Sequence, residues 1–137
     1  MIYVLFLHSG WRWVVLLALL VSIIRAARGW QRGVRFTAFD NALRHWTATI
    51  AHIQLMLGMT LFIKNPIGDK FRIIHMTGMI TAVTVITIGS ALAKRRESDA
   101  AKFATMFRWF LAALVVILSL IPWPGSPLAQ RPLLRTF

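Results

Sequence analysis

Two kinds of residue are scarce in this 137-residue chain: cysteine is absent, and only four residues are acidic. The absence of cysteine excludes disulfides, thiolate metal sites, iron–sulfur clusters and covalently attached c-type haem. The few acids leave no carboxylate pair inside an apolar segment, and no Ser–His or phosphate-binding motif occurs. We therefore expect no independent catalytic activity from this chain.

Hydrophobic residues are abundant and make up 58% of the chain, far more than a soluble domain of this size requires. They fall into four long runs, and each run has roughly the 20 residues that an α-helix needs to cross a bilayer. The sequence therefore predicts one all-α membrane domain over residues 1–137, a bundle of four transmembrane helices with an extended C-terminal tail. The helices are expected at about residues 3–24, 40–63, 71–93 and 101–121, and the tail at 122–137.

Capping and turn residues separate the four runs. Thr37 or Asp40 is a candidate N-cap for the second helix, and Ser98 or Asp99 is a candidate N-cap for the fourth. The segment 65–69 reads NPIGD, in which proline and glycine predict a tight turn between the second and third helices.

Sixteen lysines and arginines give the chain a formal net charge of +12. They lie at the ends of the apolar runs, which favours lipid headgroups rather than nucleic acid as their partner. The positive-inside rule places the more basic side in the cytoplasm, so both termini are expected on the outer (periplasmic) side of a bacterial inner membrane. Anionic headgroups are then expected beside Arg25, Arg28, Arg32, Arg35, Arg44, Lys94, Arg95, Arg96, Lys102 and Arg108, whereas the outer side carries Lys64, Lys70, Arg72, Arg131 and Arg135.

Histidines are the main candidates for chemistry inside the membrane. His8 and His75 are expected at similar depths near the outer boundary of the first and third helices, and His52 lies near the middle of the second. His45 falls at the cytoplasmic edge. A haem b in a membrane bundle needs two axial ligands that project from different helices at matching depth. Depth therefore favours His8 with His75 as the iron ligands, and a pairing with His52 needs a tilted arrangement.

Other residues near these histidines fit the same hypothesis. Arg12 follows His8 by four residues, so it shares a helix face with His8 and is available to a haem propionate. Gly10, Gly58, Gly78 and Gly89 are small positions within the spans, where a macrocycle has room to press against a helix.

Each of these residues also has a plainer interpretation. His8 and His75 are close enough to the outer boundary to be simple interfacial residues. His52 is also suited to a hydrogen bond with a threonine or glutamine across a helix pair. Arg12 is long enough to extend its charge toward the outer surface, and methionines such as Met79 more often fill gaps in a core than bind metal.

Several short motifs follow one another along the chain: HSGWRWVVLL, DN, HIQLMLGMTLF, H-x-x-x-M, TIG and IPWP. In this order they resemble, over nearly the whole chain, a family of small bacterial four-helix membrane proteins labelled cytochrome b-like. The resemblance implies non-covalent haem b and electron transfer. One departure is Ile74, where family members often have an acidic residue before the third-helix histidine. Position by position, the resemblance singles out His8, Arg12, Trp13, His52, Gln54, Gly58, His75, Met79 and Pro122–Trp123.

Together these features favour a small b-type cytochrome-like subunit that passes electrons within a respiratory or photosynthetic membrane complex. Two alternatives stay open: a haem-free accessory subunit of a larger complex, and a quinone- or metal-binding membrane protein that uses His52, Gln54 and His75. The expected partners are membrane lipids and a larger complex or a second copy of the chain, with quinone as a further candidate. The cofactor-binding candidates are His8, His75, His52, Arg12, Met79 and Gln54, of which the three histidines are the candidate iron ligands.

Overall fold

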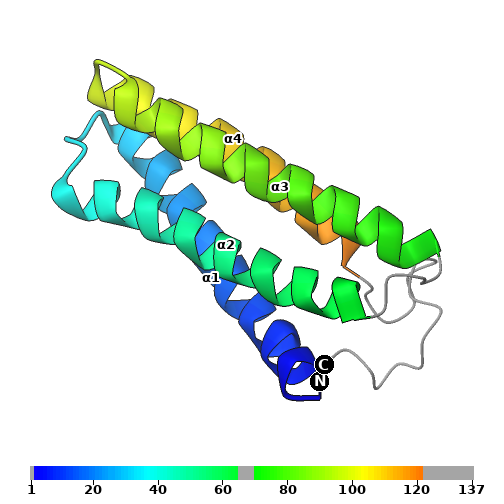
Figure 1. Cartoon of the computed structure of the whole chain (residues 1–137). Helices are drawn as coiled ribbons and strands as arrows, with labels where there is room; N and C mark the ends of the chain where they lie inside the picture. The colour runs from blue at the N-terminus through cyan, green and yellow to red at the C-terminus, as the bar shows by residue number, and fades with distance from the viewer. Residues whose placement is uncertain (1, 65–69, 122–137) are drawn as a thin grey trace.

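The computed structural model describes residues 2–64 and 70–121, and within these ranges every long element is an α-helix. Each of the four helices is long and apolar enough to cross a membrane, so the predicted all-α bundle of four helices of spanning length is confirmed. The predicted tight turn at 65–69 and the tail at 122–137 lie outside the described residues. The helices are α1 (Ile2–Arg32), α2 (Ala38–Lys64), α3 (Lys70–Arg95) and α4 (Asp99–Leu120) (Figure 1).

The first helix is longer than the sequence analysis predicted, because it continues through the basic stretch after Ile24 to Arg32. Arginine and alanine are good helix formers, so a change from apolar to charged residues does not end a helix. Gly33 has a positive φ of 64°, and this left-handed conformation ends the helix as glycine commonly does. The first connection is therefore short and covers only residues 33–37.

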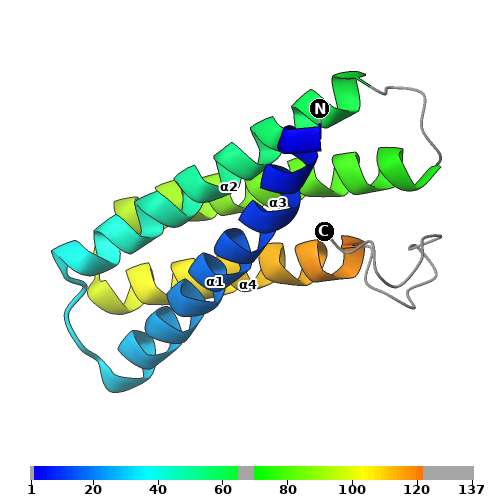
Figure 2. The ribbon, with the colours of Figure 1, turned by 90° about the horizontal axis from the view of Figure 1, so that it is seen from below.

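The helices run up and down, and each packs against its neighbours in chain order, with α4 closing the ring against α1. This arrangement places α1 diagonally across the bundle from α3. Figure 2 shows α1 tilted relative to the other three helices. We call the end with the connections 33–37 and 96–98 the basic end. We call the opposite end, where α1 and α3 begin and α2 and α4 end, the histidine end (Figure 1).

The hydrophobic core is concentrated toward the basic end. No residue of α2 after Ala51 is buried, and no residue of α3 before Ala82 is buried. Glycine allows close helix contact here, because a Cβ on Gly29 would lie 2.6 Å from the ring of Phe103. The largest fully buried apolar side chains are Leu19, Ile86, Phe103, Met106 and Phe110.

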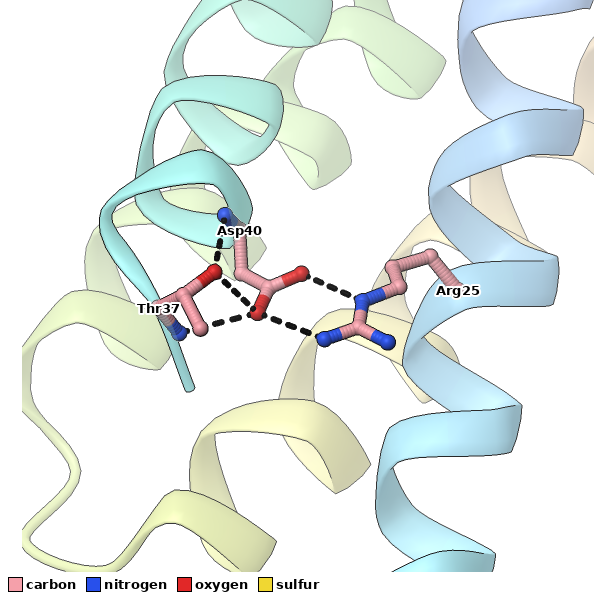
Figure 3. Close-up of polar contacts among 3 residues, drawn as sticks. All are labelled: Arg25, Thr37 and Asp40. Atoms are coloured by element: carbon pink, nitrogen blue, oxygen red, sulfur yellow. Dashed lines mark hydrogen bonds and ion pairs between the residues drawn. The ribbon is translucent and has the colours of Figure 1, made fainter. Parts of the chain in front are cut away.

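The start of α2 is fixed by a reciprocal cap and an ion pair (Figure 3). The hydroxyl of Thr37 accepts a hydrogen bond from the Asp40 backbone N–H at 3.4 Å, and the Asp40 carboxylate accepts from the Thr37 backbone N–H at 2.9 Å. Thr37 is therefore the N-cap of α2, in a capping box with Asp40. The same carboxylate accepts two bonds from Arg25 of α1, at 2.6 and 3.1 Å, which ties the two helices together.

Polar contacts also join the other helices near the basic end. Arg44 of α2 is only 6% exposed and donates to the Ser90 hydroxyl of α3 at 2.7 Å, as well as to Asn41 within its own helix. Ser98, one of the two candidates that the sequence offered, caps α4 by accepting a hydrogen bond from the Ala101 N–H at 3.1 Å. These contacts fix the register of the helices at the basic end.

Candidate functional site

His8 and His75 approach each other across the bundle at the histidine end. Their ring centroids lie 6.5 Å apart, and the ring planes are nearly perpendicular at 77°. The two residues come from α1 and α3, the diagonal helices, so the approach takes place through the interior of the bundle rather than at a contact between neighbours. The structure therefore brings together the two histidines whose predicted depths match.

His75 is held in a defined orientation by the end of α4. Its Nδ1 lies 2.8 Å from the backbone carbonyl oxygen of Leu120. A carbonyl only accepts, so Nδ1 carries the proton, and in the neutral ring Nε2 is the unprotonated nitrogen. Metal-binding histidines are commonly oriented by this kind of second hydrogen bond.

His8 lies against the backbone of α2. A Cβ on Gly58 would be 3.1 Å from Cε1 of His8, so the imidazole occupies the space that a larger residue at this position would take. One turn earlier on α2, the Gln54 amide donates to the His8 carbonyl oxygen at 2.9 Å. Gly58 and Gln54 together place His8 at the interface between α1 and α2.

Two buried polar atoms at this site have no hydrogen-bond partner within the described part of the chain: Nδ1 of His8 and Oε1 of Gln54. Buried polar atoms are nearly always paired in folded proteins, and those that are not commonly mark functional sites. Both atoms come from residues that the sequence analysis selected, and both lie at the histidine end.

Arg12 and Met79 are each one helical turn from a histidine of the pair. Arg12 is half-buried, and its guanidinium carbon lies 5.3 Å from the centre of the Trp13 ring. Met79 is partly buried and packs against the hydrophobic core. The structure therefore places a cation on the α1 side of the pair and an apolar thioether on the α3 side.

His52 is not part of this cluster. Its Nε2 lies 2.8 Å from the hydroxyl of Thr87 in α3, and that hydroxyl donates its single hydrogen to the Val83 carbonyl at 2.7 Å. Nε2 of His52 must therefore be the donor, so in the neutral ring only Nδ1 has a lone pair. Thr87 is twelve residues from His75, which is about 18 Å along a helix. The plainer interpretation of His52, a hydrogen bond across a helix pair, is confirmed.

The contact between His75 and the Leu120 carbonyl was not predicted from the sequence. The last four carbonyls of a helix have no N–H donor within the helix, so they can accept hydrogen bonds from side chains. Four residues after Leu120 the sequence has Pro124, which has no N–H to offer a continuing helix. The proline therefore signals a free carbonyl, but not which side chain binds it.

The histidine pair fits a metal held by two imidazoles. Two rings on opposite sides of one metal, each bound through nitrogen at about 2 Å, have centres roughly 6 Å apart, close to the 6.5 Å observed here. The four glycines considered as positions for a macrocycle differ, and Gly89 is covered by the side chain of Trp109. Gly58 is covered by His8 and Gly78 by the side chain of Leu120, whereas no atom lies within 4 Å of a Cβ on Gly10.

In comparisons with known proteins, no family model, no curated protein and no solved structure matches this chain. Its own residues are therefore the basis on which a function is assigned.

Proposed function

We propose that this chain is a small electron-transfer subunit that binds one non-covalent haem b through His8 and His75. In this proposal the histidine end faces the periplasm, the basic end faces the cytoplasm, and the membrane is the bacterial inner membrane. The observation that carries the proposal is the 6.5 Å approach of two imidazoles from diagonal helices.

The state of the two rings supports the assignment. Hydrogen bonding to Leu120 leaves Nε2 of His75 unprotonated in the neutral ring, which is the form that binds iron. His8 has a buried Nδ1 without a hydrogen-bond partner in the described residues. A simple interfacial histidine would be expected to satisfy its ring nitrogens with water or headgroups.

The number of ligands favours haem over a bare metal ion. Zinc sites use four protein ligands, or three protein ligands and a water. Haem iron needs at most two protein ligands, because the porphyrin nitrogens supply the other four. Among residues 2–64 and 70–121, no group of three or more His, Cys, Asp or Glu side chains is placed to hold a metal ion. A pair of histidines is the donor set that an iron porphyrin requires.

The bound haem supplies a one-electron couple. The chain's own residues hold and orient it: His8 and His75 are the ligands, the Leu120 carbonyl fixes the ring of His75, and Gln54 fixes the backbone at His8. Arg12, on the same face as His8, supplies a cation for a propionate.

The test is a reduced-minus-oxidised absorption spectrum of the purified protein from a haem-competent host, with the haem extracted and counted per chain. We expect one b-type haem in the wild type and in His52→Ala, and none in His8→Ala or His75→Ala, all with wild-type helicity. His52→Ala is the matched control because it also removes an in-membrane histidine.

Two results would overturn the proposal. If both His8→Ala and His75→Ala retain haem, the two histidines are not the iron ligands. A folded wild type without haem leaves the accessory-subunit hypothesis in its place, and co-purification with a larger complex then supports that hypothesis.

A further inference from the structure

A pocket lies at the basic end, away from His8 and His75. It has a volume of about 360 Å³ and is bounded by the last three turns of α1, the connection to α2 and the first turn of α2. The residues that line it are Val21, Ile24, Arg25, Arg28, Arg32, Val34 and Phe39.

Three of these residues are arginines on one face of α1, and they differ in their partners. Arg25 turns toward α2 and is neutralised by the Asp40 carboxylate (Figure 3). Arg28 and Arg32 are exposed, and the structure gives neither of them a hydrogen bond or ion pair within the described part of the chain. The pocket therefore carries two uncompensated positive charges, one helical turn apart.

The other lining residues are apolar and exposed. Val21, Ile24, Val34 and Phe39 have exposed fractions of 42, 45, 37 and 63%. Val21 and Ile24 precede the arginines on α1, so they lie deeper in the membrane than Arg28 and Arg32. Charge at the membrane surface with apolar side chains below it matches the layout of a phospholipid, whose phosphate lies above its acyl chains.

We propose that this pocket is a binding site for one anionic phospholipid of the leaflet at the basic end. Arg28 and Arg32 bind the phosphate, for which the planar guanidinium offers paired N–H donors. Val21, Ile24 and Phe39 contact the upper part of an acyl chain. Basic pockets beside transmembrane helices are a recurrent form of anionic-lipid site, and a free phosphate ion would leave the apolar half of this one unfilled.

The site can be tested by native mass spectrometry of the full chain in detergent micelles, titrated with dioleoyl phosphatidylglycerol or dioleoyl phosphatidylcholine. We expect one phosphatidylglycerol per chain, bound more tightly than phosphatidylcholine. The double variant Arg28→Gln/Arg32→Gln should bind phosphatidylglycerol about tenfold more weakly, because it loses charge-assisted hydrogen bonds. Its helicity should be unchanged, since both side chains are exposed.

The matched control is Lys94→Gln/Arg95→Gln, which removes two exposed charges from the same end of the bundle but outside the pocket. It should keep the wild-type affinity. Wild-type affinity of Arg28→Gln/Arg32→Gln for phosphatidylglycerol overturns the proposal. An equal loss of affinity in the control also overturns it, because it indicates that the lipid is attracted by the overall positive charge of this end and not by the pocket. Equal binding of phosphatidylcholine also overturns it. The titration is repeated with inorganic phosphate or glycerol 3-phosphate as a competitor. If either displaces phosphatidylglycerol at concentrations similar to those of the lipid, the pocket binds a soluble anion and the proposal is overturned.

Discussion

The two ends of the bundle are built differently, although the same four helices run through both. At the basic end the core is closed by fully buried side chains, and buried Asp40 and Arg44 are hydrogen-bonded across helix pairs. At the histidine end, α2 and α3 have no buried residue over 52–64 and 70–81. Two buried polar atoms that have no hydrogen-bond partner among residues 2–64 and 70–121, Nδ1 of His8 and Oε1 of Gln54, belong to this second end.

The difference separates two uses of polar residues in a membrane. A buried network that is fully paired rigidifies a protein and specifies its packing. A polar group that is buried without a partner costs free energy, and proteins keep such groups mainly where a ligand or reaction needs them. We infer that the basic end holds the helices in register while the histidine end carries the site, as expected if functional regions are drawn from the less stable part of a fold.

Removal of the Asp40 carboxylate should give the largest loss of stability. Asp40→Ala leaves Arg25 without its counter-charge and deletes the capping box, so we expect the free energy of unfolding to fall by about 3 kcal/mol. The measurement is unfolding by dodecyl sulfate in micelles, followed by circular dichroism. Asp99→Ala, an exposed acid in the first turn of α4, is the control and should cost less than about 1 kcal/mol.

A double variant sharpens the first prediction. Arg25→Met combined with Asp40→Ala also removes the guanidinium that Asp40→Ala leaves without a counter-charge. The double variant should therefore recover part of the lost free energy of unfolding. Equal stability of Asp40→Ala and the wild type would show that the ion pair does not hold α1 against α2.

Matched glycine substitutions at the two ends should give the next largest difference. Gly29→Ala forces a Cβ against the ring of Phe103, which is fully buried and has little room to move, so a cost of about 1–3 kcal/mol is expected. Gly10→Ala meets no atom within 4 Å and gains helix propensity, so it should be neutral or stabilise by up to about 1 kcal/mol. The same unfolding assay compares them. A similar loss of stability in both variants would contradict the difference in packing between the basic end and the histidine end.

Much of the fold was predictable because it depends on local properties of the sequence. Four apolar runs of spanning length and a serine before the fourth predicted the four helices and the Ser98 cap. The extension of α1 to Arg32 was not predictable from hydropathy alone, because the change to charged residues after Ile24 does not end the helix, whereas Gly33 does.

The candidate site was less predictable, because it depends on how the helices are rotated about their axes. Depth along the chain was sufficient to pair His8 with His75. It could not show that His52 faces Thr87 at the exposed α2–α3 contact, nor that the end of α4 docks its Leu120 carbonyl on His75. Both contacts join residues far apart in sequence, and nothing in their local pattern sets the rotation.

Gly58→Ala should have a small effect on stability and a larger one on the site. The added Cβ would lie 3.1 Å from Cε1 of His8, so the imidazole must shift by a few tenths of an ångström. We expect a loss of less than about 1 kcal/mol in the unfolding assay, because the added Cβ meets a side chain that is only partly buried rather than backbone. If the proposed haem is bound, its absorption band or midpoint potential should change in Gly58→Ala and stay unchanged in Gly10→Ala. An unaltered spectrum in both would show that the contact of His8 with Gly58 does not position the ligand.

The smallest effect is expected from the hydrogen bond between His52 and Thr87. Interhelical hydrogen bonds in membranes average about 0.6 kcal/mol, because alternative partners are available when the bond is lost. His52→Ala and Thr87→Val should each destabilise by roughly this amount, and the double variant should cost less than their sum because both remove the same bond. Strict additivity in this cycle would mean that the bond contributes nothing. A loss of several kcal/mol would instead show that the His52–Thr87 contact is a major source of stability. Stabilising polar contacts would then not be confined to the basic end but would also occur in the middle of the helices.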